Sequence, residues 1–298
     1  MPDCIGAHNV RDIRKGVSLY FEHELTRIER MELDRIYNED CLQGMRRMEA
    51  ESVDLTVTSP PYDNLRTYNG YCFDFENIAK ELYRVTKQGG VVVWVVGDAT
   101  IKGSETGSSF RQALYFMEIG FNLHDTMIYQ KANVPFYDPR NKRYKHAFEY
   151  MFVFSKGEVK TFNPIKDKPT LSSGVVSKSL DHGRSQNNKR RERTYKPYVQ
   201  GEFQARFNIW TYDIGNNSTT KDDVAFNHPA IFPERLARDH IVSWSNEGDV
   251  VLDPFMGSGT TAKVARALNR HYIGFEISAE YCEIIRKRLE QTKTLFDL

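Results

Sequence analysis

The pattern of apolar and polar residues changes twice along the chain after the first 30 residues. Between residues 31 and 156, short apolar runs alternate with amphipathic segments of helical spacing. From about residue 157 the sequence is polar with few apolar runs, and the alternation returns after residue 225. Because strands that alternate with helices give a mostly parallel sheet, the pattern predicts an α/β core that is interrupted by an insertion.

Two apolar runs in the first part are expected to be strands of this sheet. Residues 91–98, VVVWVVGD, do not alternate with polar residues, which is typical of a parallel strand covered on both faces. Residues 53–59, VDLTVTS, form a second run, which stops at Pro60 and Pro61 because proline has no amide hydrogen for a sheet ladder. The sequence therefore predicts a rigid turn directly after a buried strand.

The helix expected between these two strands is amphipathic. It covers residues 75–90, FENIAKELYRVTKQGG, and the pair Gly89-Gly90 is expected to end it. The other elements predicted before residue 157 are a surface helix within the first 30 residues, a short strand ending near Asp40 and a helix after it, a helix at 108–121, and hairpin strands at 123–131 and 147–157.

After the insertion, helices and strands alternate again. The predicted elements are a helix at 232–245 with Pro233 near its first turn, a strand at 249–254, a helix at 257–270 opened by a glycine turn, a strand at 271–277, and a helix at 278–292 opened by Ser278. Strands follow helices on both sides of the insertion, which supports one sheet made from both parts of the chain.

Composition excludes several classes of protein. Of the 298 residues, 40% are hydrophobic and 27% are charged, which is ordinary for a globular protein. The four cysteines lie far apart without a CxxC pair, which argues against a zinc site or a disulfide framework and indicates a reducing compartment. No run reaches the roughly 20 apolar residues of a membrane span, and the first residues lack the apolar core of a signal peptide. A cytoplasmic protein is expected.

Charge is distributed unevenly. The net charge is +1, yet the stretch from Lys156 to Arg206 holds 12 lysines and arginines against 5 acidic residues, a local net charge of +7. This stretch is either a solvated insertion or an element that binds a polyanion.

The most specific stretch is DVVLDPFMGSGTTAKVARALNRHYIGFEI. A strand ends at Asp253, a glycine turn opens a helix, and the next strand ends at the acidic residue Glu276. Glycines let a ligand approach the backbone, and an acid at that place binds ribose hydroxyls. Asp253 would repel a phosphate and attract an ammonium group, so a ligand with a ribose and an amino-acid end, S-adenosylmethionine, fits better than a dinucleotide. The alternative is a purely structural strand-to-helix turn.

These motifs carry a family resemblance. TSPPY at 58–62, followed by LDPFMGSGTT at 252–261, resembles the amino-type DNA methyltransferases, and the order of the motifs resembles their β group. The resemblance covers about residues 32–290 and implies a circularly permuted Rossmann-like fold with a mostly parallel sheet. It implies a catalytic half at 31–156, a basic target-recognition insertion at 157–225 and a cofactor-binding half at 226–298. The leader helix expected at 1–30 has no counterpart in the family core and forms a fourth region.

The resemblance also implies which residues hold S-adenosylmethionine. The methyl transfer itself needs no metal ion, so no metal site is expected. Asp40 and Cys41 lie where the family contacts the adenine, and His228 and Pro229 lie near the methionine end, although Asp40 and His228 could equally cap helices. The remaining candidates for cofactor binding are Asp253, Pro254, Phe255, Gly257, Ser258, Gly259, Thr260, Thr261 and Glu276.

The catalytic candidates are Ser59, Pro60, Pro61 and Tyr62. An exocyclic amine is a poor nucleophile, so its hydrogens must be held by fixed acceptors, here Ser59 Oγ and the Pro60 carbonyl. Tyr62 can stack on the base, which has to be flipped out of the duplex to reach such a pocket. The alternative for this motif is a strand-ending turn with a packed tyrosine.

Double-stranded DNA is the expected partner, and the resemblance leaves open a homodimer and a cognate restriction endonuclease. Asn133 and Phe136 are candidates to line the base pocket, and Asp98 either faces the cleft or caps a turn. The candidates for DNA contact are Arg66, Lys131, Asn133, Arg140, Lys142, Arg143, Lys189, Arg190, Arg191 and Arg193.

Ser59 bears on which base is modified. Within the family, serine before Pro-Pro-Tyr is associated mainly with cytosine N4, and aspartate or asparagine mainly with adenine N6, so cytosine is expected and adenine is the alternative. Modification of RNA or protein, or a DNA-binding module without activity, fits less well, because both motifs are intact and the insertion is basic.

Overall fold

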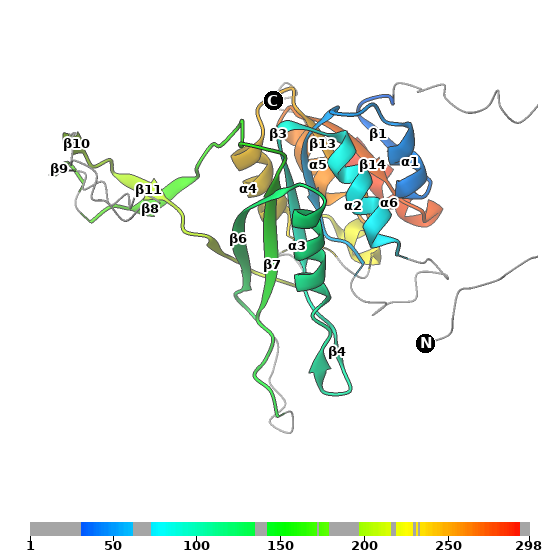
Figure 1. The fold of residues 1–298 in the computed structure, drawn as a ribbon, viewed down its shortest axis with the longest axis horizontal. Helices are drawn as coiled ribbons and strands as arrows, with labels where there is room; N and C mark the ends of the chain where they lie inside the picture. The colour runs from blue at the N-terminus through cyan, green and yellow to red at the C-terminus, as the bar shows by residue number, and fades with distance from the viewer. Residues whose placement is uncertain are drawn as a thin grey trace, which may run out of the picture.

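The computed structural model describes residues 31–61, 73–134, 142–171, 173–178, 197–215, 219–228, 231 and 233–292. The predicted leader at 1–30 lies outside this part. An eight-stranded sheet forms the centre (Figure 1). Its strands lie in the spatial order β1 (Arg35–Tyr37), β14 (His271–Phe275), β13 (Val250–Asp253), β2 (Val53–Thr58), β3 (Thr86–Val96), β7 (Phe148–Ser155), β6 (Asn122–Lys131) and β12 (Ile209–Tyr212).

Neighbouring strands are parallel, except that β7 runs antiparallel to β3 and β6. The mostly parallel α/β sheet is therefore confirmed, and so is the hairpin of β6 and β7.

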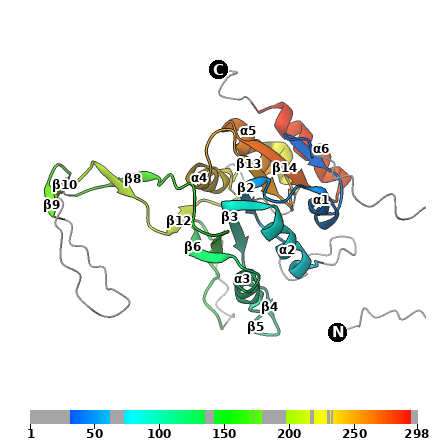
Figure 2. The ribbon, with the colours of Figure 1, turned by 45° about the horizontal axis from the view of Figure 1, so that its top comes forward.

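Helices cover both faces of the sheet, as Figure 2 shows. One face carries α1 (Cys41–Arg47), α2 (Phe75–Val85) and α3 (Ser108–Glu118), and the other carries α4 (Glu234–Trp244), α5 (Thr260–Ala267) and α6 (Ala279–Glu290). A 3-10 helix, η1 (Asp223–Asn227), precedes α4. Asp40 and Ser278 accept hydrogen bonds from the first turns of α1 and α6, so these helices begin where the sequence predicts.

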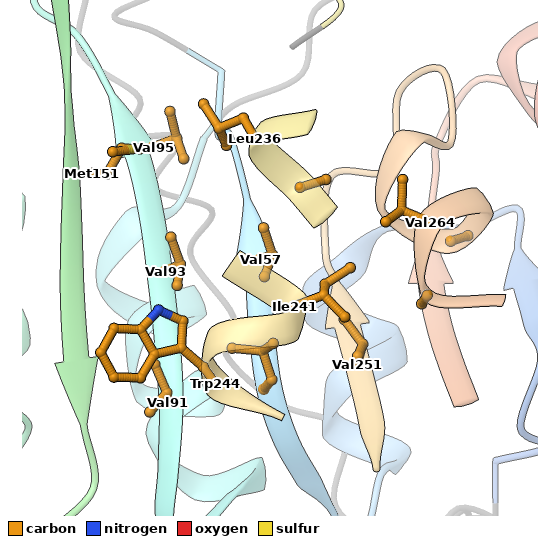
Figure 3. Close-up of a cluster of buried hydrophobic side chains, with 14 of the residues drawn as sticks. Val57, Val91, Val93, Val95, Met151, Leu236, Ile241, Trp244, Val251 and Val264 are labelled. Atoms are coloured by element: carbon orange, nitrogen blue, oxygen red, sulfur yellow. The ribbon is translucent and has the colours of Figure 1, made fainter. Parts of the chain in front are cut away.

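The core explains why β3 reads as an unbroken apolar run. Val93 faces the same layer as Val57 and Val251, and Leu236 and Ile241 of α4 pack onto these three valines (Figure 3). The β3 residues Val92, Trp94 and Val96 point to the opposite face and pack into the layer of α1, α2 and α3. Each fully buried side chain of this size contributes roughly 1.5–3 kcal/mol.

The predicted end of the second helix is wrong. α2 ends at Val85 rather than at Gly89-Gly90, and residues 86–90 open β3 instead. The amide of Gly89 donates to the Lys156 carbonyl, and the amide of Lys156 donates to the Gly90 carbonyl. Pairing with the end of β7 therefore draws the glycine pair into the sheet.

The basic insertion contains an arm, residues 166–205, built from two antiparallel pairs. β8 (Lys166–Pro169) pairs with β11 (Phe203–Ala205), and β9 (Val176–Lys178) pairs with β10 (Pro197–Val199). Figure 2 shows the arm projecting from the side of the body that carries β12 and α4. The predicted insertion range of 157–225 thus includes β12, which is a strand of the central sheet because it pairs with β6.

A short hairpin follows β3, and the sequence pattern did not predict it. It consists of β4 (Thr100–Ile101) and β5 (Ser104–Glu105). Among the described residues, no helix has the length and apolar character needed to cross a membrane.

Two threonines of β2 allow a matched test of buried hydrogen bonding. Thr56 and Thr58 are both fully buried. The Thr58 hydroxyl donates to Asp253 Oδ1 over 2.7 Å. Among the described residues, Thr56 Oγ1 is the one buried side-chain nitrogen or oxygen atom without a hydrogen-bond partner. Thr56 lies in register between Leu252 and Val92, which are both apolar.

We expect Thr56→Val to stabilise the protein by about 1 kcal/mol, because burial of an unpaired hydroxyl is unfavourable. Thr58→Val should destabilise it by about 1–3 kcal/mol, since Asp253 then loses a donor. Urea unfolding of the two variants measures both changes. Equal destabilisation by the two substitutions would contradict the difference in hydrogen bonding between the Thr56 and Thr58 hydroxyls.

Candidate functional site

The strands that end at the two motifs are neighbours at the centre of the sheet. Val251 and Leu252 of β13 lie in register with Leu55 and Thr56 of β2. From β13 the chain passes through α5 to β14 on one side, and from β2 it passes through α2 to β3 on the other. Connections that diverge in this way open a crevice at the carboxyl ends of the strands, which is where α/β sheets bind ligands. Both motifs therefore begin at the same edge of the sheet.

Asp253 links the two strands. Its Oδ1 accepts the Thr58 hydroxyl at 2.7 Å and the Phe255 amide at 3.0 Å, and the Thr261 hydroxyl donates to the Val57 carbonyl at 3.1 Å. Burial raises the pKa of Asp253 to about 6, although hydrogen bonds from Thr58, Phe255 and Thr261 oppose the rise. The carboxylate is therefore a buried negative charge, and none of the described lysines, arginines or histidines forms an ion pair with it.

The glycine turn between β13 and α5 requires glycine at two positions. Gly257 and Gly259 have φ of +51° and +82°, which favour glycine. A Cβ on Gly259 would lie 2.7 Å from Ile285 Cγ2, and one on Gly257 would lie 3.1 Å from the His228 ring. The turn is thus held between α6 and His228 with its backbone close to the strand edge.

Glu276 closes the turn from the end of β14. Its two carboxylate oxygens accept the amides of Gly257 and Ser278, each at 2.8 Å. Burial raises the pKa of Glu276, and the charge of Asp253 adds to the rise, whereas the amide hydrogen bonds oppose it. A carboxylate has about four acceptor positions, so Glu276 can still accept hydrogen bonds from a ligand.

The start of α1 lies at the same edge, one strand beyond Glu276. Asp40 Oδ1 accepts the Gln43 amide at 3.1 Å, so Asp40 does cap α1. The Asn38 amide group donates to the carbonyls of Glu276 and Ile277 at 2.8 and 3.0 Å, which joins the ends of β1 and β14. Cys41 is buried in the first turn of α1. The adenine contacts of Asp40 and Cys41 remain a prediction.

His228 is buried beside the turn. Its ring lies against Gly257 and makes an edge contact with Tyr281, with a centroid distance of 4.4 Å. The structure therefore brings His228 to the glycine turn, while Pro229 lies outside the described residues.

Sequence reasoning missed Arg288, which positions the glycine turn from α6. The side chain is fully buried, and its Nη1 donates to the Ser258 carbonyl at 2.5 Å and to the Thr260 hydroxyl at 3.3 Å. The same guanidinium binds Asp222 at 3.0 Å and Glu234 at 2.6 Å. The sequence pattern did indicate a buried arginine, since Arg288 lies three residues after Ile285 and one before Leu289, inside the apolar stripe of a helix.

The catalytic motif follows β2 without a gap. Ser59 and Pro61 are half-buried and Pro60 is buried, whereas Tyr62 and Arg66 lie outside the described residues. Beside this motif, Pro254 is buried, and Phe255 packs on Phe73 and Trp94 at centroid distances of 5.6 and 6.2 Å.

Several predicted DNA contacts have partners within the chain. Lys131 forms an ion pair with Glu149 at 2.6 Å. Asn133 exchanges two hydrogen bonds with the backbone of Ile214, at 2.6 and 2.7 Å, so its amide is occupied by a structural role. Arg143 binds the β4–β5 hairpin.

The remaining DNA and pocket candidates divide into two groups. Lys142 is exposed. Those outside the described residues are Phe136, Arg140, Lys189, Arg190, Arg191 and Arg193. Within the described part of the chain, no group of three or more histidine, cysteine or acidic side chains could hold a metal ion.

Comparisons with known proteins agree with this geometry. The orphan methyltransferase M.BamHII of Bacillus amyloliquefaciens is 60% identical over 239 residues, which are 80% of this chain and 89% of the relative. The type II methyltransferase M.BglII of Bacillus subtilis is 28% identical over 261 residues, 85% of this chain and 68% of the relative.

Two solved structures share the fold. The cytosine-N4-specific PvuII DNA methyltransferase superposes with a TM-score of 0.59 at 20% identity, over 90% of this chain and 97% of the other. The M1.HpyAVI–SAM complex superposes with a TM-score of 0.55 at 22% identity, over 86% of this chain and 98% of the other. The family model described as "DNA methylase" matches residues 53–287, which include both motifs and the strands that carry them. This chain therefore belongs to the N6/N4 DNA methylase family.

Proposed function

We propose that this protein transfers the methyl group of S-adenosylmethionine to N4 of a cytosine that is flipped out of double-stranded DNA. The coarser function, a site-specific DNA methyltransferase that depends on S-adenosylmethionine, follows from its family. The observation that carries the proposal is the 2.7 Å hydrogen bond between Thr58 and Asp253, because it joins the strand before Ser59 to the strand before the cofactor turn.

The residues at the strand edge fit S-adenosylmethionine. Glu276 has acceptor positions left for ribose hydroxyls, and its bond to the Gly257 amide keeps it beside the turn. The buried Asp253 carboxylate suits a ligand with an ammonium group, because a cation would relieve the unfavourable burial of its charge. When bound, the cofactor supplies a methyl group attached to a positively charged sulfur.

Ser59 and Pro60 are proposed to orient the cytosine amine. The Ser59 hydroxyl and the Pro60 carbonyl accept its two hydrogens, which directs the nitrogen lone pair at the methyl carbon. As the nitrogen–carbon bond forms, the sulfur–carbon bond breaks and its electron pair stays on sulfur. The nitrogen becomes cationic and acidic, and its proton leaves to Ser59, the Pro60 carbonyl or water. We propose that Tyr62 stacks on the ring.

The proposal of cytosine as the modified base depends on the presence of serine at position 59, and adenine N6 is the second candidate. The PvuII enzyme, whose fold this chain shares, is cytosine-N4-specific, which supports cytosine by analogy of fold only.

We propose that the arm and the neighbouring insertion bind duplex DNA through their basic charge, in the cytoplasm of a prokaryotic cell. Since M.BamHII is an orphan methyltransferase, we propose that this protein acts without a cognate restriction endonuclease. A circularly permuted chain order and a homodimer remain proposals from the family.

The first test concerns the ribose contact. Glu276→Ala should weaken binding of S-adenosylmethionine by roughly 1–3 kcal/mol, because hydrogen bonds to a charged acceptor are lost. Isothermal titration calorimetry measures the affinity, and Glu118→Ala, which changes an exposed glutamate of α3, serves as the control. An unchanged affinity in folded Glu276→Ala would remove this residue from the site.

The second test uses the raised pKa of Asp253. In the ligand-free protein the protonated carboxyl is favoured up to pH of about 6, and a cationic ligand favours the ionised form. Affinity for S-adenosylmethionine should therefore be lost as the pH falls through 6, by about tenfold between pH 7 and pH 5. Asp253→Asn should bind weakly at both pH values. A wild-type affinity that does not change over this range would contradict the role of Asp253.

The third test identifies the product. Mass spectrometry of nucleosides from treated DNA should reveal N4-methylcytosine, and Ser59→Ala should lower the rate by roughly 10²–10³, the effect of removing one preorganised hydrogen bond. Ser52→Ala, just before the opposite end of β2, should leave the rate unchanged. N6-methyladenine without N4-methylcytosine would reject cytosine and support the second candidate.

A further inference from the structure

The β4–β5 hairpin lies at the edge where the base is proposed to bind. It follows β3 after three residues, and β3 pairs with β2 so that Trp94 is opposite Thr58. Chain that continues past Val96 therefore leaves the sheet at the same edge as Ser59. Figure 1 shows β4 extending beyond this edge, beside the segments that leave β6 and enter β7.

The tip of the hairpin exposes an apolar side chain and a cation. Ile101 pairs with Ser104, and the two residues between them, Lys102 and Gly103, have φ of +49° and +80°, which makes a tight turn. Ile101 is 52% exposed and Lys102 is exposed as well. About half of this large apolar side chain is thus left in contact with solvent at the end of a projecting hairpin.

The base of the hairpin is held firmly. Asp98 accepts the Ser109 amide and hydroxyl at 2.9 and 2.5 Å and the hydroxyls of Ser108 and Thr106 at 3.0 and 3.3 Å. Burial alone would raise the pKa of Asp98, but these hydrogen bonds hold it below its usual value. Asp98 therefore caps a turn, as one of its two predicted roles required, and the Thr106 amide closes the hairpin by donating to Ala99.

A second segment supports the hairpin and adds charge. Arg143 binds the Gly103 carbonyl and lies 3.4 Å from Glu105, so it joins the segment 142–147 to the turn. Together the hairpin and this segment hold four basic residues and one acidic residue, which are Lys102, Lys142, Arg143, Lys145 and Glu105. Positive charge around an exposed apolar tip matches a polyanion with an apolar interior, which describes stacked DNA.

We propose that the β4–β5 hairpin is a wedge that enters the duplex beside the target base, with Ile101 inserted into the base stack and Lys102 on a phosphate. The inference rests on the proposed methylation of a flipped base. Insertion of an apolar side chain unstacks a base step, and its contacts with the bases offset part of the free-energy cost of extruding the target base. The rigid mount at Asp98 keeps the tip aligned with the pocket after Ser59.

The arm is less suited to this task. It leaves the body on the side of β12 and α4, and β9 and β10 lie far from the centre of the sheet (Figure 2). An element in that place can contact DNA at a distance from the flipped base, whereas the hairpin is next to it.

The test compares Ile101→Ser with wild type and with Leu114→Ser, which changes an exposed leucine of α3. The methylation site is first mapped by sequencing DNA that the wild-type enzyme has modified. Single-turnover rates are then measured on a paired duplex and on a duplex with an abasic site opposite the target base. Affinity for S-adenosylmethionine and the melting temperature are measured for each variant.

Ile101→Ser should slow methylation of the paired duplex by roughly 10–100-fold, because unstacking then lacks its wedge. The abasic duplex should restore a rate near that of wild type, since its target base is already unpaired. Cofactor affinity, melting temperature and both Leu114→Ser rates should not change. A wild-type rate on the paired duplex, or an equal loss on both duplexes, would overturn the wedge. If wild type itself does not methylate DNA, the proposed function fails instead.

Discussion

The contact of β2 with β13 is the constraint on which the rest of the site depends. These strands come from sequence positions about 200 residues apart, and their carboxyl ends carry the two motifs. Thr58 and Asp253 complete the contact with a buried hydrogen bond. The bond fixes the distance between the turn after Ser59, which we propose faces the base, and the turn after Asp253, which we propose faces the cofactor. Methyl transfer in line requires such a fixed distance, because a small misplacement of the reacting atoms lowers the rate strongly.

The same contact keeps the ligand-free site in an unfavourable state. Asp253 is buried with no cationic partner among the described residues, and the raised pKa expresses how far burial disfavours its charge. Glu276 is in a similar state, since burial raises its pKa although backbone amides donate to both of its carboxylate oxygens. A ligand that brings an ammonium group and hydroxyls relieves both. The protein thus holds its binding groups in place before the ligand arrives, and the fold bears the energetic cost.

Rigid supports lie behind each part of the site. Arg288 holds the glycine turn to α6, to Glu234 at the start of α4 and to Asp222. Farther along α4, Asp239 binds Arg206 at the base of the arm over 2.5 Å and the Tyr212 hydroxyl over 2.8 Å. α4 therefore contacts both the support of the cofactor turn and the base of the arm. Asp98 holds the base of the hairpin after β3 through hydrogen bonds to Thr106, Ser108 and Ser109. Both elements that project from the body therefore begin at side chains with several partners.

The sequence by itself determined the α/β class, the order of the main strands and helices, and the two motifs. The reason is local: prolines end β2, apolar runs mark strands covered on both faces, and Gly257 and Gly259 are needed where φ is positive. Only the tertiary structure decided that α2 ends at Val85, because the glycine pair after it bonds with Lys156. It also decided that β12 joins the sheet and that Asn133 and Arg143 are occupied by partners distant in sequence. Such pairings depend on which segments meet in space, and a one-dimensional pattern of polarity does not carry that information.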